Sequence, residues 1–169
     1  FVLDKHAPAD PAAITEADDL AMLAGLAEVV RQATEAFEDY QYTDALEAAE
    51  KFFWTFCDDY LELVKDLAYG GRGDAEAASA RAALRIALGV QLRLLAPFMP
   101  FVTEEVWSWW KPGSVHHATW PTVDELPTGG DVALVDDVAA ALIGIRGVKS
   151  NAKVSMKTPI LSVTLAAVK

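Results

Sequence analysis

The sequence predicts a mainly α fold, in which long helices form a bundle and a small α/β appendage follows toward the C-terminal end. Apolar residues recur at three- and four-residue intervals over several long stretches, which is the spacing of one helix face. Glycine and proline gather between those stretches, and one short segment alternates apolar and polar residues. A chain of 169 residues, 53% of them hydrophobic, can bury one core of this kind.

Residues 47–67 form the central helix of the predicted bundle, which we call the hub. One line of side chains at helical spacing comprises Phe52, Phe56, Tyr60, Leu63, Val64 and Leu67. A second line, at the border of the polar face, comprises Trp54, Asp58, Leu61 and Lys65. Apolar residues spread over so wide an arc need partner helices on two sides, or a partner helix and a ligand.

Two further long helices are predicted around the hub. Thr15 is a candidate N-cap, and Asp19 in the first turn is favoured by the helix dipole, so the first helix should run to about Tyr40. Because only a few residues separate this helix from the hub, the two should pack antiparallel. The glycine-rich residues 70–73 end the hub, and a third helix should cover residues 74–96.

The following elements are shorter or looser. Pro97 and Pro100 break the third helix, and a short helix should restart through Trp107. Residues 112–130 contain Pro, Gly and Thr and are typical of a long connecting loop. A fifth helix should then cover residues 131–150.

The last apolar segment, residues 160–165, has the alternation of a half-buried strand. A lone strand is not stable, so its partner lies either elsewhere in the chain or in sequence beyond Lys169, and we favour the second. These assignments divide the chain into a helical bundle over residues 1–121 and a partial α/β tail, a helix and then a strand, over residues 122–169.

The charge is strongly acidic and unevenly distributed. The net charge is −11, and residues 1–75 hold 17 Asp and Glu against 5 Lys and Arg, whereas residues 76–169 hold 8 against 9. Such a chain is a poor non-specific binder of nucleic acid, because phosphate binding depends on Lys and Arg. The plainest interpretation of the acidity is a solubilising surface.

Several classes of function are disfavoured. No apolar run approaches the ~20 residues of a membrane span, so we expect no membrane partner. Cys57 is the only cysteine, which excludes an internal disulfide and fits a reduced cytoplasmic setting. The adjacent His116 and His117 lack a further ligand cluster, so no metal site is predicted. No nucleophile–base pair or paired-carboxylate pocket stands out, so no catalytic residue is predicted.

Three segments resemble one enzyme family. Residues 53–65, FWTFCDDYLELVK, resemble the signature helix in the anticodon-binding region of valyl-tRNA synthetases. Residues 94–107, LLAPFMPFVTEEVW, are similar to a segment shared by the class Ia synthetases for valine, isoleucine and leucine. Trp120-Pro121 is similar to the dipeptide that closes the next loop in those enzymes. The FCDDYLE string favours the valine enzymes, although Asp59 stands where many relatives have tryptophan.

The resemblance covers essentially the whole chain and implies an anticodon-binding helical bundle that grips the anticodon stem-loop of valine tRNA. In that family, an upstream domain activates valine with ATP and magnesium and an inserted domain performs editing. This region would therefore be a non-catalytic part of a ligase, without a cofactor of its own. Its partners would be the tRNA and the catalytic and editing domains of the same chain. The alternative is a helical domain that binds protein and not RNA through exposed aromatic residues.

Candidate RNA-binding residues follow from how proteins recognise unpaired bases, by aromatic stacking, hydrogen bonds to base edges and a few cations. Trp54, Asp58 and Lys65 would offer a ring, an acceptor and a cation on one side of the hub. Alternatively, Trp54 packs under the short helix around Trp107, and the other two are ordinary surface residues. Phe1 is a separate candidate, because in the resembled family the helix that ends at this position borders the anticodon loop.

Two sets of basic residues are further candidates. A string with no acid between its members comprises Arg146, Lys149, Lys153 and Lys157. The first three have near-helical spacing and could face phosphate, the alternative being a solvated helix end favoured by the dipole. The arginines of the third helix are weaker candidates, the alternative being pairs with acids of the first half: Arg81, Arg85 and Arg93.

Overall fold

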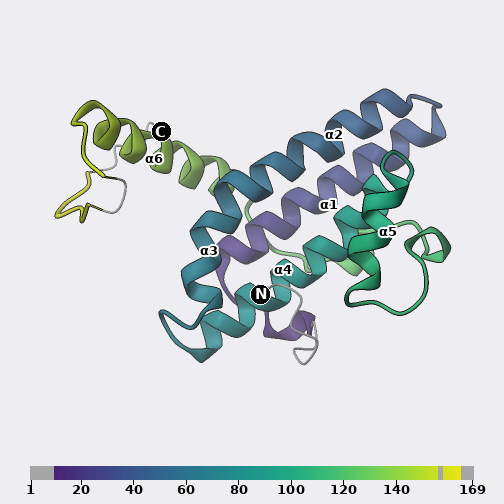
Figure 1. Cartoon of the computed structure of the whole chain (residues 1–169), viewed down its shortest axis with the longest axis horizontal. Helices are drawn as coiled ribbons and strands as arrows, with labels where there is room; N and C mark the ends of the chain where they lie inside the picture. The colour runs from purple at the N-terminus through teal and green to yellow at the C-terminus, as the bar shows by residue number, and fades with distance from the viewer. Residues whose placement is uncertain (1–9, 156–157, 165–169) are drawn as a thin grey trace.

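The computed structural model describes residues 10–155 and 158–164, which fold into a helical bundle (Figure 1). Its helices are α1 (Ala17–Glu38), α2 (Tyr42–Thr55), α3 (Leu61–Ala68), α4 (Asp74–Leu95), α5 (Pro100–Ser108) and α6 (Val132–Asn151). A π-turn, η2 (Phe56–Tyr60), joins α2 to α3, and short 3-10 turns are η1 (Pro11–Ala13), η3 (Val115–His117) and η4 (Val123–Glu125). The predicted mainly α fold is confirmed.

Helices α1 and α2 lie side by side and antiparallel, as predicted (Figure 1). The apolar stripe of α1 supplies Leu23, Leu26 and Val30 to the core, all almost fully buried. The chain reverses at Tyr40, whose φ of 60° is left-handed. This reversal is closed by a 2.7 Å hydrogen bond from the Gln41 amide to the Ala36 carbonyl, the pattern of a Schellman turn.

The hub is one continuous helical rod of α2, η2 and α3. A π-turn holds one residue more than an α-turn, so residues beyond it rotate by about 100° relative to those before it. Of the residues predicted for the apolar line beyond the π-turn, Val64 is completely buried, whereas Leu63 and Leu67 are only partly buried. Ala68, which was not predicted for that line, is also completely buried, so the buried face beyond the π-turn is centred on Val64 and Ala68.

Helix α4 is the middle of the bundle and packs against α1, α2, α3 and α5. Small side chains allow this close approach, since Ala80, Ala83 and Ala87 are completely buried. The break predicted at the two prolines is confirmed, because α4 ends at Leu95 and α5 begins at Pro100.

Hydrogen bonds tie the loop after α5 to the bundle. The Glu104 carboxylate accepts hydrogen bonds of 2.9 Å from the Ser114 hydroxyl and from the Val115 amide. The indole of Trp120 donates to the hydroxyl of Thr34 in α1 at 2.8 Å. These contacts hold the long loop, and with it η4, against α1 and α4.

The start of α1 differs from the prediction. The helix begins at Ala17, and Thr15 is not its N-cap. Instead, the Ser79 hydroxyl of α4 accepts hydrogen bonds from the amides of Thr15, at 3.0 Å, and Glu16, at 3.2 Å. A tertiary contact thus holds the two residues that lead into the helix.

The predicted strand is wrong for the part of residues 160–165 that the structure describes. Residues 158–164 are irregular and exposed, with Leu161 at 99% exposure, and Leu165 lies outside the described residues. The described part of the chain offers no neighbouring strand, and a strand without a partner does not form. Helix α6 packs against α1. The division of the chain into a bundle and a tail at residue 121 stays a prediction.

Within the described residues, no helix is both long enough and apolar enough to cross a bilayer.

Candidate nucleic-acid interface

Trp54 lies on the last turn of α2 and is 55% exposed. Its indole nitrogen is 3.5 Å from the Glu50 carboxylate, and its ring meets the Phe53 ring edge-on, with centroids 5.5 Å apart. The alternative in which Trp54 packs under the helix around Trp107 is therefore wrong. More than half of the indole faces solvent, where a base could stack on it.

The other two residues of the predicted line are separated from Trp54 by the π-turn. Asp58 lies within η2 and is exposed, and Lys65 is exposed on α3, where it forms an ion pair with Glu62. Because the π-turn rotates α3 relative to α2, Lys65 lies about a quarter turn away from the line that Trp54 begins. Trp54 and Asp58 remain neighbours on the hub, and Lys65 faces another direction.

Arg146 joins α6 to the hub. Its guanidinium nitrogen Nη1 lies 3.7 Å from Oδ1 of Asp59, a π-turn residue whose side chain is one quarter exposed. Arg146 itself is 44% exposed, so the pair lies at the surface and retains access to solvent. Through this contact, Asp59 of the hub faces α6.

The remaining cations of the basic string lie at the far end of α6. Lys149 is half-buried in the last turn, whereas Lys153 follows the helix with a left-handed φ of 52°. Hydrogen bonds from the Lys153 amide to Ser150 and from the Val154 amide to Lys149 close a Schellman turn. Lys153 is therefore not on the helical face of the first two cations. Phe1 and Lys157 lie outside the described residues.

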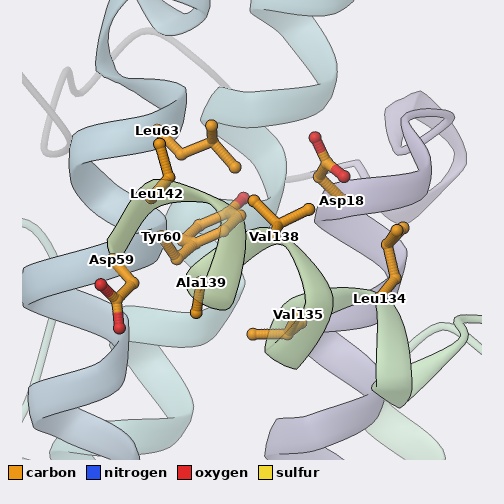
Figure 2. A pocket seen from close by; sticks show the side chains of 9 residues that line it. All are labelled: Asp18, Asp59, Tyr60, Leu63, Leu134, Val135, Val138, Ala139 and Leu142. Carbon is orange, nitrogen blue, oxygen red and sulfur yellow. The ribbon is translucent and has the colours of Figure 1, made fainter. Parts of the chain in front are cut away.

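An apolar seam lies between α6, the π-turn and α1, and Figure 2 shows the side chains that line it. Val135, Val138 and Leu142 of α6 line it opposite Tyr60 of the hub. Its volume is only about 20 Å³, so the side chains fill it and it serves as a packing contact. The seam holds α6, and with it Arg146, next to the hub.

A buried cluster of polar side chains holds Tyr60, the last residue of the π-turn, in place. The Tyr60 hydroxyl donates to Oδ1 of Asp19 at 2.6 Å, and the Ser79 hydroxyl donates to Oδ2 at 2.6 Å. Asp19 is 1% exposed, and burial raises the pKa of its carboxyl, while the two hydroxyl donors oppose that rise. The cluster links α1, the hub and α4 at one point.

Sequence reasoning missed this cluster because Asp19 was interpreted only through the helix dipole. The available signal was Tyr60, a tyrosine within an apolar stripe, whose buried hydroxyl needs a partner.

Arg81 and Arg93 of α4 have partners other than the acids of the first half. The Arg81 side chain donates to the Ala68 carbonyl at 2.7 Å and so caps the end of α3. Arg93 forms a bidentate pair with Glu125, and Arg85 lies over the Trp110 ring.

Residues 19–165 match the protein family described as the anticodon-binding domain of tRNA ligase. The chain belongs to this family. It is also similar to the valine–tRNA ligase of Cutibacterium acnes, with 64% identity over 156 residues, covering 91% of this chain and 18% of the relative. The identity to the valine–tRNA ligase of Thermobifida fusca is 56% over 160 residues, covering 93% and 18%. For Salinispora tropica it is 50% over 173 residues, covering 90% and 20%.

The chain therefore spans about a fifth of the length of the curated relatives it matches. The resemblance drawn from residues 53–65 and 94–107 is confirmed. As an anticodon-binding domain, the chain presents Trp54, Asp58 and the pair of Asp59 with Arg146 around one π-turn.

Proposed function

We propose that this anticodon-binding domain is part of a valine–tRNA ligase and binds the anticodon stem-loop of valine tRNA. The observation that carries the proposal is Trp54, an aromatic ring more than half exposed on the central helix of a domain of this family. The identity of 48–64% to valine–tRNA ligases supports the choice of valine.

A groove beside α2 supports recognition of an unpaired base. It has a volume of about 220 Å³ and lies between α1, the hub and the start of α6. The Phe52 and Phe56 rings line it, stacked with centroids 6.4 Å apart, together with polar side chains of Gln32, Lys51 and Thr55. Rings combined with hydrogen-bonding groups suit bases that have left the stack.

The charge distribution suits a domain that distinguishes anticodon bases better than one that supplies most of the affinity for tRNA. With a net charge of −11, the chain repels phosphate over much of its surface. Cations near the proposed interface include Lys51 beside the groove, Arg146 and Lys149 on α6, and Lys153 just after it. We infer that these cations hold the backbone of the loop, while most of the affinity for tRNA comes from other domains of the ligase.

We further infer that the chemistry of the ligase takes place outside this chain. Activation of valine with ATP and magnesium, and editing, would belong to the other four fifths of the enzyme. Exposed apolar side chains on α6, Ile143 at 63% and Val148 at 70%, favour contact with those domains. The cytoplasmic location of the ligase stays a prediction from the single cysteine.

The experiment is a fluorescence titration of the 169-residue chain, at low salt, with two labelled RNA stem-loops. One carries the valine anticodon, and the other has the same stem with swapped anticodon bases. Anticodon binding predicts tighter association with the first. Equal affinity for the two, or no binding to either, would contradict anticodon reading by this chain and favour a domain that binds only protein.

A further inference from the structure

A surface of aromatic side chains lies at the end of the bundle where α1 turns into α2 and α4 leads to α5 (Figure 1). The ring of Phe37 in α1 joins the two connections, because its centroid is 5.7 Å from that of Tyr42 and 5.7 Å from that of Phe98. It also meets the Trp120 ring edge-on at 5.1 Å. We call this surface the aromatic end, and its rings are Phe37, Tyr40, Tyr42, Phe98, Phe101 and Trp120.

Two rings of the aromatic end face solvent. Phe101, in the first turn of α5, is 89% exposed, and Tyr40 is 78% exposed. An open groove of about 360 Å³ lies on the same end of the bundle, lined by residues of α1 together with Pro97 and Trp120. Single exposed apolar residues are ordinary, whereas a group of them beside a groove marks a contact surface.

The backbone at Tyr40 gives an independent indication. Its φ of 60° lies in the left-handed region, where glycine is the usual residue after a helix because a Cβ atom is strained there. The exposed Tyr40 ring meets the Tyr42 ring edge-on, with centroids 6.4 Å apart, and buries little of its own surface. A strained residue that packs so little against its own domain is typical of a binding surface.

The aromatic end carries negative charge. Residues 33–50, which include the turn between α1 and α2, hold six Asp and Glu and no Lys, Arg or His. Residues 97–105 hold two more acids and again none of these cations. Glu38 lines the groove and pairs with no cation among the described residues. RNA phosphate would be repelled here, whereas Lys and Arg of a protein partner would be attracted.

The aromatic end is separate from the proposed anticodon interface. Tyr42 begins α2 and Trp54 lies on its last turn, so the two residues are roughly 18 Å apart along the helix axis. Each surface can therefore hold a different partner at the same time.

We propose that the aromatic end is the docking surface for another domain of the same ligase, a domain that presents Lys and Arg around apolar side chains. This step rests on the proposed function, in which the chain is one part of a valine–tRNA ligase. The chain spans about a fifth of the length of its relatives, so such a domain would be covalently attached and present at high local concentration. Aromatic side chains and methionine are enriched in protein interfaces, and acids around them complement a basic partner.

The test is hydroxyl-radical footprinting, in which mass spectrometry measures how fast each aromatic side chain is oxidised. The 169-residue chain is compared with the full-length ligase that contains it, both without RNA. In the ligase, oxidation of Tyr40 and Phe101 should fall severalfold, and Tyr40 should approach the rate of Tyr60, which is only 4% exposed. Unchanged oxidation of Tyr40 and Phe101 would overturn the proposal.

The stem-loop RNA provides a second arm of the test. Trp54 should keep its oxidation rate in the RNA-free ligase and lose reactivity when the valine stem-loop binds. The stem-loop added to the 169-residue chain should leave Tyr40 and Phe101 unchanged, and protection of these two rings would identify an RNA surface and contradict docking. If the stem-loop fails to protect Trp54, the anticodon proposal fails, while protection of Tyr40 and Phe101 in the ligase still supports docking.

A variant in the full-length ligase assigns the docking to Tyr40, with the oxidation rate of Phe101 as the readout. Tyr40→Gly removes both the ring and the backbone strain, so Phe101 should be oxidised severalfold faster than in the unmodified ligase. The 169-residue chain with the same change should unfold at the same or a higher urea concentration. Loss of docking without loss of stability separates a docking role from a structural one, and unchanged protection of Phe101 would refute the assignment.

The charge of the surface is tested by combining Glu38→Gln with Asp39→Asn at the end of α1. Removing these two acids should weaken docking to a basic domain, so oxidation of Phe101 should rise and depend less on salt. Asp74→Asn combined with Glu76→Gln removes two acids from the first turn of α4 and is the matched control, which should change neither. Equal oxidation of Phe101 in the two double variants would contradict a basic partner.

Discussion

Replacing Tyr60 by phenylalanine tests the buried cluster that anchors the π-turn. The change removes one hydroxyl and leaves the ring, which is 4% exposed, in place. The lost bond is the 2.6 Å donation to the Asp19 carboxylate. A hydrogen bond to a charged group contributes about 1.5–3 kcal/mol, so the free energy of unfolding should fall by about that amount at pH 7.

The loss should depend on pH. Burial raises the pKa of Asp19 in the folded chain. The contribution of Asp19 to the free energy of unfolding is therefore complete below the pKa that Asp19 has in the unfolded chain. That contribution is lost as pH rises through the pKa of the folded chain. Without the Tyr60 donor this pKa rises further, so the ionised carboxylate costs more at neutral pH. As pH falls toward the raised pKa, more of Asp19 is protonated, and the effect of Tyr60→Phe should shrink toward the roughly 1 kcal/mol of a neutral hydrogen bond.

Urea denaturation followed by circular dichroism measures the loss of unfolding free energy at neutral pH and at the lower pH. The lower pH should stay above the pI of 4.6, because the chain is least soluble there. Tyr40→Phe removes a hydroxyl from a tyrosine that is 78% exposed and serves as the control. A Tyr60→Phe loss that matches the control, or one that is equal at both pH values, would refute the reasoning.

Three further predictions concern the hub and its supports. Val64→Ala should cost about 1.5–3 kcal/mol in the urea assay, because Val64 is completely buried; a loss below about 0.5 kcal/mol would contradict that burial. Trp120→Phe deletes the donor to Thr34 and should cost about 1 kcal/mol by thermal denaturation, an unchanged transition being the contrary result. Asp59→Asn should release Arg146 for phosphate, so stem-loop affinity should rise and depend more steeply on salt; an unchanged salt slope would contradict this.

The long helices could be predicted because their periodic burial is a local property of the sequence. The first, third and fifth helices follow apolar stripes, and Gly73 and Pro97 mark the two ends of the third. The π-turn could not be predicted, because inserting one residue into a turn depends on tertiary contacts such as that between Tyr60 and Asp19. The alternation in residues 160–165 predicted a strand, but alternation alone provides no partner.

The candidate site was partly predictable for a similar reason. Helical spacing identified Trp54 as a border residue, but only the packing of neighbouring helices decides whether a border ring is buried or exposed. Spacing also placed Lys65 on the same line, which holds only for an uninterrupted α-helix. The contact between Arg146 and Asp59 joins elements far apart in sequence, and no local pattern indicates it.

The central claim, that this domain reads an anticodon loop with an exposed ring of its hub, is tested most directly by comparing two tryptophans. Trp54 and Trp109 are 55% and 51% exposed, and each indole nitrogen lies within 3.5 Å of a glutamate one turn earlier. Each is replaced by alanine, and binding to the valine anticodon stem-loop is titrated. Trp54→Ala should lose about 1–3 kcal/mol of binding free energy with little change in stability, and Trp109→Ala should lose almost none. Equal binding by the two variants would contradict the account.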